Sequence, residues 1–90
     1  MALTLRRTGQ FKRDYKLMKR RGRDMAQLRR VMRKLANKER LEPTYRDHVL
    51  VGNYVGRREC HVGPDWLLIY THESDSIVFE RTGTHADLFG

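Results

Sequence analysis

Apolar residues in the first forty positions recur at the spacing of an α-helix. Phe11, Tyr15 and Met18 stand at i, i+4 and i+7, with basic residues between them. Gly22 marks the end of this segment, and Asp24 is a suitable N-cap for a second helix. The second apolar stripe consists of Met25, Leu28, Val31, Met32 and Leu35. The pattern predicts two amphipathic helices joined by a tight turn.

Residues outside these helices alternate as strands do. Residues 3–7 alternate weakly and predict a first strand. Residues 57–62, beyond Pro43, alternate more clearly. Successive side chains of a strand point to opposite faces, so Cys60 and Val62 share one face of this strand and Glu59 and His61 share the other.

Two further strands are expected nearer the C-terminus. Residues 66–70 form a continuous apolar run, which is typical of a central strand covered on both faces. Residues 76–81 follow a turn at Ser74 and alternate again, which would direct Ile77, Phe79 and Arg81 to one side.

The predicted element order is therefore β-α-α-β-β-β. Two N-terminal helices would pack on one face of a mainly antiparallel, twisted sheet, which makes the fold α+β. The length of 90 residues suits one domain over residues 1–90. The lone Cys60 has no disulfide partner, and we expect it to be a buried, inert thiol.

Charge narrows the partners of this domain. The chain has 19 Lys and Arg against 11 Asp and Glu, a formal net charge of +8. Such a surplus favours polyanionic partners such as nucleic acid, an anionic membrane or an acidic protein. A membrane is the weakest of these, because no apolar run approaches the roughly 20 residues of a bilayer span. No secretory signal pattern opens the chain either, so we expect a cytoplasmic protein.

Three histidines near strand ends or loops suggest acid-base chemistry. If the strand of His61 neighbours the strand that ends at Arg81, then His61, Asp65, Arg81 and His85 would converge at one edge of the sheet. Imidazole suits metal-free RNA cleavage, because one ring can take the 2′-hydroxyl proton while another protonates the leaving 5′-oxygen. Arg81 would stabilise the charge that builds on the phosphate.

Plainer interpretations stay open beside this one. A single histidine is more often structural or solvated than catalytic, and His72 lies in a polar turn. Asp65 could instead cap the turn after Pro64. A zinc site is an alternative, but no ligand spacing supports it, so we expect neither metal nor cofactor.

Several motifs of the second half together resemble a known family. They are residues 45–48 (YRDH), 52–62 ending in RECHV, 64–70 (PDWLLIY), 79–85 (FERTGTH) and 88–90 (LFG). The chain resembles the RelE/ParE toxin superfamily and, within it, the YafQ-type mRNA interferases. The likeness covers nearly the whole chain, strongly over the second half and loosely over the helices.

The resemblance implies a RelE-like fold and a toxin that enters the ribosomal A site and cuts mRNA. It implies catalytic roles for His48, His61, Asp65 and His85. Trp66 and Phe89 match residues that position RNA or support the site, and Glu59 falls where an acidic residue is expected. All three are therefore candidates for substrate binding. Val49 departs from the common His-Pro-Leu pattern of the family, and this difference affects the expected conformation of the loop at His48. An antitoxin that wraps the toxin is the implied partner.

Basic helix faces fit the same hypothesis. The residues expected to meet ribosomal RNA phosphates are Lys12, Lys16, Lys19, Arg20, Arg29, Arg30, Arg33 and Lys34. The alternative interpretation is that these basic residues are ordinary solvated faces of the helices.

The sequence thus predicts the toxin of a type II toxin-antitoxin system, a ribosome-dependent endonuclease that cleaves mRNA by 2′-hydroxyl attack. The alternative is a non-catalytic ParE-like toxin or RNA-binding module. An acidic antitoxin segment that folds on binding would cover the basic surface, in a complex that also binds DNA.

Overall fold

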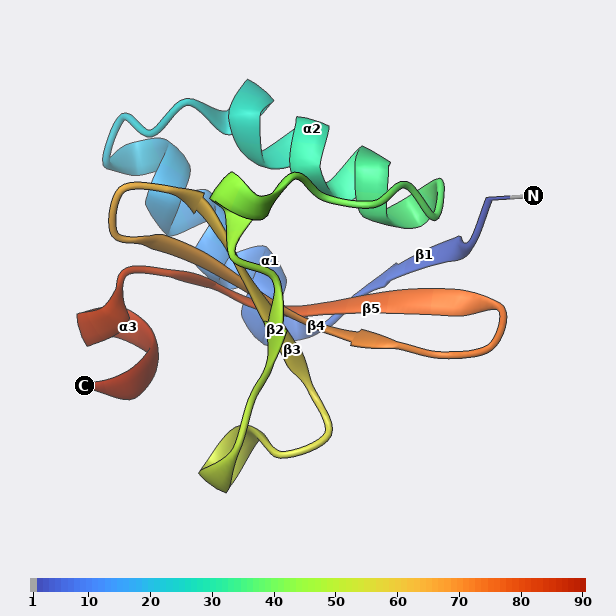
Figure 1. The fold of residues 1–90 in the computed structure, drawn as a ribbon. Coiled ribbons are helices and arrows are strands. Elements are labelled where there is room, and N and C mark those ends of the chain that lie inside the picture. The colour runs from blue at the N-terminus through green and yellow to red at the C-terminus, as the bar shows by residue number, and fades with distance from the viewer. Residues whose placement is uncertain (1) are drawn as a thin grey trace.

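The computed structural model describes residues 2–90, which form one sheet with helices on both of its faces (Figure 1). The elements are β1 (Thr4–Arg7), α1 (Gly9–Arg20), α2 (Met25–Ala36), β2 (His48–Val49), β3 (Arg58–Gly63), β4 (Trp66–His72), β5 (Ser76–Gly83) and α3 (His85–Phe89). Short 3-10 turns at Pro43–Tyr45 and Gly52–Tyr54 flank β2.

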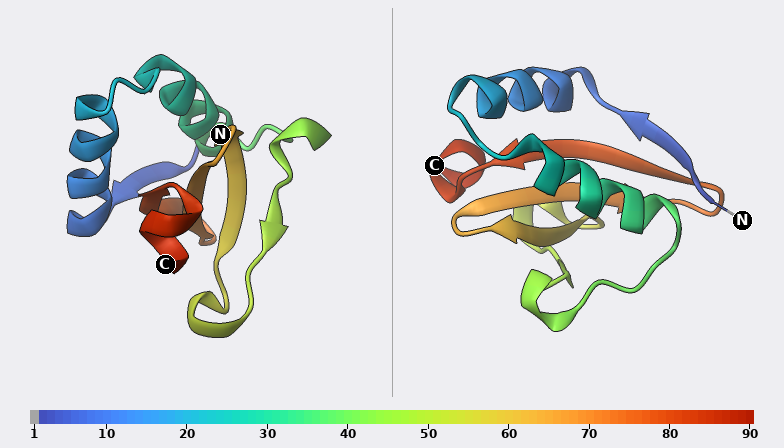
Figure 2. Two further views of the ribbon diagram at one scale, coloured as in Figure 1. Left: turned by 90° about the vertical axis from the view of Figure 1, so that its left-hand side faces the viewer. Right: turned by 90° about the horizontal axis from the view of Figure 1, so that it is seen from above.

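The five strands lie in the order β1-β5-β4-β3-β2. All neighbours are antiparallel except β1 and β5, which run parallel. The α+β fold with a mainly antiparallel sheet is therefore confirmed. The N-terminal helices α1 and α2 lie together on one side of the sheet, and α3 lies apart from them (Figure 2).

The two predicted helices are confirmed, with Gly22 after the first and Asp24 before the second. Thr8 caps α1 by accepting a hydrogen bond from the backbone N–H of Phe11, and Asp24 caps α2 through the N–H of Ala26. Gly22 between them has φ +81°, a left-handed conformation that favours glycine. Every residue of the predicted apolar stripe of α2 is buried.

Strand β4 is the centre of the fold, as its apolar run predicts. Trp66, Leu68 and Tyr70 pack in the cluster beneath α1 and α2. Leu67 and Ile69 face the other way and pack with Leu88 of α3. Leu67, Leu68 and Ile69 are fully buried, and each such side chain stabilises the fold by about 1.5–3 kcal/mol.

Cys60 also lies in the helix-side cluster, where burial raises the pKa of its thiol. The inert thiol expected from the sequence thus has its physical cause in the core.

Strand β5 departs from the predicted alternation. Adjacent residues of β4, Ile69 and Tyr70, pair with Arg81 and Phe79, so Glu80 is an extra residue that forms a β-bulge. The bulge reverses the faces beyond it. The prediction that Ile77, Phe79 and Arg81 share one side is wrong for Arg81, because Arg81 lies opposite Ile69 on the α3 side of the sheet.

Helix α3 was not predicted, although its N-terminus carries a readable signal. Thr84 and Asp87 form a reciprocal capping box at the first turn. The helix places His85 at its start and Leu88 against the sheet.

Within residues 2–90, no helix combines the length and the apolarity that a membrane crossing requires.

Candidate active site

Three histidines from three elements form a row on the α3 side of the sheet. The ring centroids of His48 and His61 lie 6.3 Å apart, and those of His61 and His85 lie 6.1 Å apart. We call these three residues the histidine row. His48 comes from β2, His61 from β3 and His85 from the first turn of α3. The three histidines therefore lie close together, as the sequence analysis predicts.

Glu59 lies beneath the row. Its side chain is only 5% exposed, and its Oε1 lies 3.3 Å from Nε2 of His48 and 3.7 Å from Nε2 of His61. The sheet explains this placement, because Glu59 pairs across strands with His48 and stands two residues before His61 on β3. A buried carboxylate would repel phosphate. Glu59 therefore lies against two imidazoles, and substrate binding by Glu59 stays a prediction that its burial does not favour.

His48 has acceptors at both ring nitrogens. Its Nδ1 donates to the backbone carbonyl of Arg46 at 2.6 Å, while Nε2 faces the Glu59 carboxylate. The His48 ring is thus held between a backbone carbonyl and a carboxylate. These two contacts fix the orientation of the His48 ring at the end of the histidine row.

His61 has a different environment. Its side chain is 23% exposed. Burial lowers the pKa of His61; the Glu59 carboxylate opposes this shift, and the Arg46 guanidinium reinforces it. His61 is therefore mainly neutral at pH 7 and can accept a proton.

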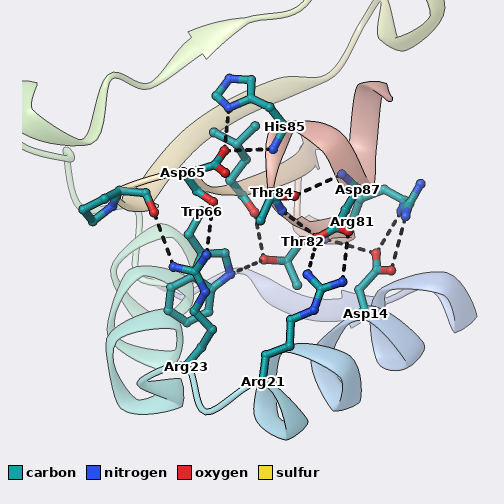
Figure 3. A network of polar contacts seen from close by, with 12 residues as sticks. Asp14, Arg21, Arg23, Asp65, Trp66, Arg81, Thr82, Thr84, His85 and Asp87 are labelled. Carbon is teal, nitrogen blue, oxygen red and sulfur yellow. Dashed lines mark hydrogen bonds and ion pairs between the residues drawn. The ribbon is translucent and has the colours of Figure 1, made fainter.

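Asp65 of the β3–β4 turn and His85 of α3 form a hydrogen-bonded pair (Figure 3). Asp65 Oδ1 accepts from the backbone N–H of His85 at 3.0 Å and from its Nδ1 at 2.9 Å. These two hydrogen bonds lower the pKa of Asp65. The contact fixes the imidazole orientation and leaves its Nε2 for a substrate. Asp65 also caps α3, because it accepts the hydrogen bond of the first N–H of that helix. The sequence alternative was that Asp65 caps the turn after Pro64.

Two arginines of the α1–α2 turn hold this pair from below (Figure 3). Arg23 donates to the carbonyls of Pro64 and Asp65 and lies 5.4 Å from the centroid of the Trp66 ring. Arg21 makes a two-pronged contact with Asp87 of α3, at 2.7 and 3.2 Å. The turn between the helices thus holds both the β3–β4 turn, which carries Asp65, and α3, which carries His85.

A cavity of about 660 Å³ opens beside these groups. Its lining residues are Gln27, Thr44, Tyr45, Arg46, His61, Val62, Gly63, Pro64, Asp65 and His85. A larger hollow of about 900 Å³ lies on the other side of the loop at residues 43–47 and contains only His72 among the histidines. The smaller cavity is the candidate active site, because it combines two members of the histidine row with a carboxylate.

Arg81 does not enter this cavity, contrary to the prediction. Its Nε lies 2.8 Å from Oδ2 of Asp14, a residue of α1 that is 5% exposed. Hydrogen bonding to Asp14 raises the pKa of Arg81. The guanidinium is thus occupied by a structural ion pair, and its assignment to the phosphate is not supported by its position.

The two aromatic candidates differ. Trp66 is 2% exposed, and its Nε1 donates to Thr82 Oγ1 at 3.0 Å. Its burial favours the second of the two roles that the resemblance implies for Trp66, which is to support the site from the core. Phe89 is 49% exposed, 6.2 Å from the His85 ring, and edge-on to Tyr54 at 5.5 Å. Base stacking by Phe89 stays a prediction that its position permits.

The basic residues of α1 and α2 belong to the two helices that cover the face of the sheet opposite α3. Seven of the eight are exposed, whereas Lys34 is half-buried and ion-paired with Glu42 at 3.0 Å. Arg29 donates to the hydroxyl of Tyr15.

Sequence reasoning missed Arg46. It has φ +48° at the end of a 3-10 turn, is exposed, and lines the cavity. No periodicity marks it, and its only sequence signal is its place beside His48. As for the zinc alternative, no cluster of three metal-ligating side chains was found among residues 2–90.

Comparison with known proteins identifies the family. Residues 3–90 match the family described as the bacterial toxin of type II toxin-antitoxin system, YafQ. The mRNA interferase toxin YafQ of Escherichia coli strain K12 is 46% identical over 84 residues, which are 92% of this chain and 91% of that protein.

Solved structures agree with this match. The crystal structure of YafQ from Escherichia coli strain BL21(DE3) has a TM-score of 0.94 and 43% identity, over 98% of this chain and 99% of that one. The toxin of the Escherichia coli DinJ-YafQ complex has a TM-score of 0.91 and 43% identity over the full length of both. This chain therefore belongs to the YafQ family of bacterial toxins of type II toxin-antitoxin systems.

Proposed function

We propose that this toxin is an endoribonuclease that cuts mRNA on the translating ribosome, in the cytoplasm. The observation that carries the proposal is the histidine row with Asp65 beside an open cavity. Its relative from strain K12 is called an mRNA interferase, which supports the same activity. The net charge of +8 supports a nucleic-acid substrate.

The reaction begins at the 2′-hydroxyl of the nucleotide before the cut. His61, neutral at pH 7 because burial lowers its pKa, accepts the 2′-hydroxyl proton. The 2′-oxygen then attacks phosphorus and the bond from phosphorus to the 5′-oxygen breaks. His85, oriented by Asp65, donates a proton through Nε2 to the leaving oxygen. The products are a 2′,3′-cyclic phosphate and a 5′-hydroxyl, each proton transfer contributing about 10² to 10⁴ in rate.

The remaining members of the site position these groups. Glu59 holds His48 and His61 by their Nε2 atoms, and Phe89 offers an exposed ring beside His85. The α1 and α2 cations contact ribosomal RNA. This arrangement explains why cleavage would depend on the ribosome, which presents message and ribosomal RNA together.

Control of the toxin falls to a cognate antitoxin. A related toxin has been crystallised in a DinJ-YafQ toxin-antitoxin complex. By charge complementarity, the partner of this chain carries an acidic segment. Binding of that segment would neutralise the basic surface until the antitoxin is lost.

The test uses purified toxin and defined ribosome–mRNA complexes. Message should be cut only when ribosomes are present, and the fragments should carry a cyclic phosphate and a 5′-hydroxyl. A message with one 2′-deoxynucleotide before the cut should resist cleavage there. Intact message together with DNA damage in arrested cells would instead favour the ParE-like alternative.

A further inference from the structure

Attack on phosphorus builds negative charge on the non-bridging phosphate oxygens, and a protein stabilises that charge best with a fixed cation. Arg81, the cation that the sequence suggested, is held by Asp14. The proton-transfer groups of the candidate active site therefore leave the binding of the phosphate to another side chain.

Most cations of the second half are already paired with carboxylates. Beyond residue 46 the chain has three arginines and no lysine. Arg57 lies 2.9 Å from Glu80, Arg58 lies 3.3 Å from Asp47, and Arg81 lies 2.8 Å from Asp14. Each pair neutralises the guanidinium it uses, so none of the three is free to bind a phosphate without breaking a contact.

Arg46 stands apart from them. Its side chain is exposed, and among the described residues that line the cavity with His61, Asp65 and His85 it is the only arginine or lysine. Among the described contacts of residues 2–90, no carboxylate lies within ion-pair distance of its guanidinium. An unpaired arginine beside two imidazoles is what a phosphate ligand requires, because guanidinium can donate two parallel hydrogen bonds to one phosphate.

The backbone of Arg46 is fixed by the site itself. Its carbonyl accepts the Nδ1–H of His48, and its φ of +48° ends the 3-10 turn Pro43–Tyr45. A left-handed conformation at a residue other than glycine is uncommon and clusters at functional sites. The loop therefore holds the arginine in register with the histidine row.

We propose that Arg46 is the residue that binds the scissile phosphate and stabilises the charge on its non-bridging oxygens. The inference rests on the proposed function. Arg46 exchanges no proton: the 2′-hydroxyl proton goes to His61, and the leaving oxygen receives one from His85.

The experiment measures single-turnover cleavage on ribosome–mRNA complexes at saturating toxin, together with ribosome binding by co-sedimentation. Arg46→Asn keeps a residue that tolerates the left-handed backbone, and Arg46→Lys keeps the charge. Arg40→Ala is the control, because Arg40 is an exposed arginine of the same connection outside the candidate active site.

Cleavage by Arg46→Asn should fall by about 10² to 10³, as when one transition-state donor is removed. Arg46→Lys should recover part of this loss, and Arg40→Ala should cut at nearly the wild-type rate. Thermal unfolding of all three should match the wild type. A near wild-type rate for Arg46→Asn would overturn the inference, as would a defect confined to ribosome binding.

A second readout does not depend on cleavage. His61 is faced by Glu59, Arg46, His48 and His85, and loss of the Arg46 charge should raise the midpoint of the His61 titration in nuclear magnetic resonance. An unchanged midpoint would show that the guanidinium is not at the site. If the wild type fails to cut while the midpoint moves, the proposed function fails and the position of Arg46 stands.

Discussion

Replacing Asp14 should show how much the ion pair between Asp14 and Arg81 contributes to the stability of the fold. The Asp14 side chain is 7% exposed and the Arg81 side chain 24% exposed, so water screens their attraction weakly. The carboxylate also accepts from Gln10 Nε2 at 2.9 Å and from the backbone N–H of Thr82 at 3.2 Å. Asp14→Ala would leave a guanidinium and a buried N–H without these partners.

The expected loss follows from this inventory. Removing one partner of a buried ion pair destabilises a protein by about 3–5 kcal/mol. A domain of 90 residues has a total stability of roughly 5–13 kcal/mol, so Asp14→Ala should unfold far more easily than the wild type. Arg6→Ala is the control, because the side chains of Arg6 and its partner Glu73 are 63% and 45% exposed, and such surface pairs contribute about 0.2–1 kcal/mol.

Urea denaturation followed by circular dichroism measures both variants. A double-mutant cycle of Asp14→Ala with Arg81→Ala should give a coupling energy of about 1–3 kcal/mol. A fully stable Asp14→Ala, or a coupling near zero, would refute the reasoning, because Arg81 would then be free for another role.

Three other outcomes follow from the site. Asp65→Asn should fold normally yet cut more slowly, because it loses the carboxylate that orients His85 and stabilises its imidazolium; an unchanged single-turnover rate would remove Asp65 from the mechanism. The pH profile of that rate should have its acid limb below 6.5, since the pKa of His61 is lowered and the base is lost only when pH falls through the shifted value; a limb above 6.5 would exclude His61 as the base. Arg21→Ala should speed amide hydrogen exchange in α3 and lower the cleavage rate while leaving the rest of the sheet protected, because the Asp87 contact is lost; unaltered exchange in α3 would show that this contact does not hold the helix.

The helices and the central strand could be predicted because their signals are local. Apolar residues at helical spacing, a capping Thr8 or Asp24 and a left-handed Gly22 each act within one or two turns. The run at residues 66–70 is apolar on both faces because helices cover both sides of β4. Such features need no knowledge of which strands are neighbours.

The features that the sequence could not predict have one cause, which is that strand register is not local. The bulge at Glu80 turns Arg81 to the other face, and the pairing of β2 with β3 places Glu59 under two histidines. Trp66 is buried because α1 and α2 cover its face of β4. None of these consequences can be obtained from periodicity along one segment.

The gathering of His48, His61, Asp65 and His85 was foreseen from residue types and from the resemblance to the toxin family. Their division of labour was not, because it depends on what each ring touches. Both His61 and His85 lie beside a carboxylate, and the sequence does not distinguish the two contacts. In the structure Glu59, beside His61, is buried, whereas Asp65, beside His85, is exposed.

The most direct test of the central claim compares three alanine variants that each lose one histidine. His61→Ala and His85→Ala remove rings of the histidine row, whereas His72→Ala removes an exposed ring elsewhere. Single-turnover cleavage of ribosome-bound message should fall by about 10² or more in the first two and stay near wild type in the third, with all three folded. Wild-type cutting by folded His61→Ala and His85→Ala would contradict the account.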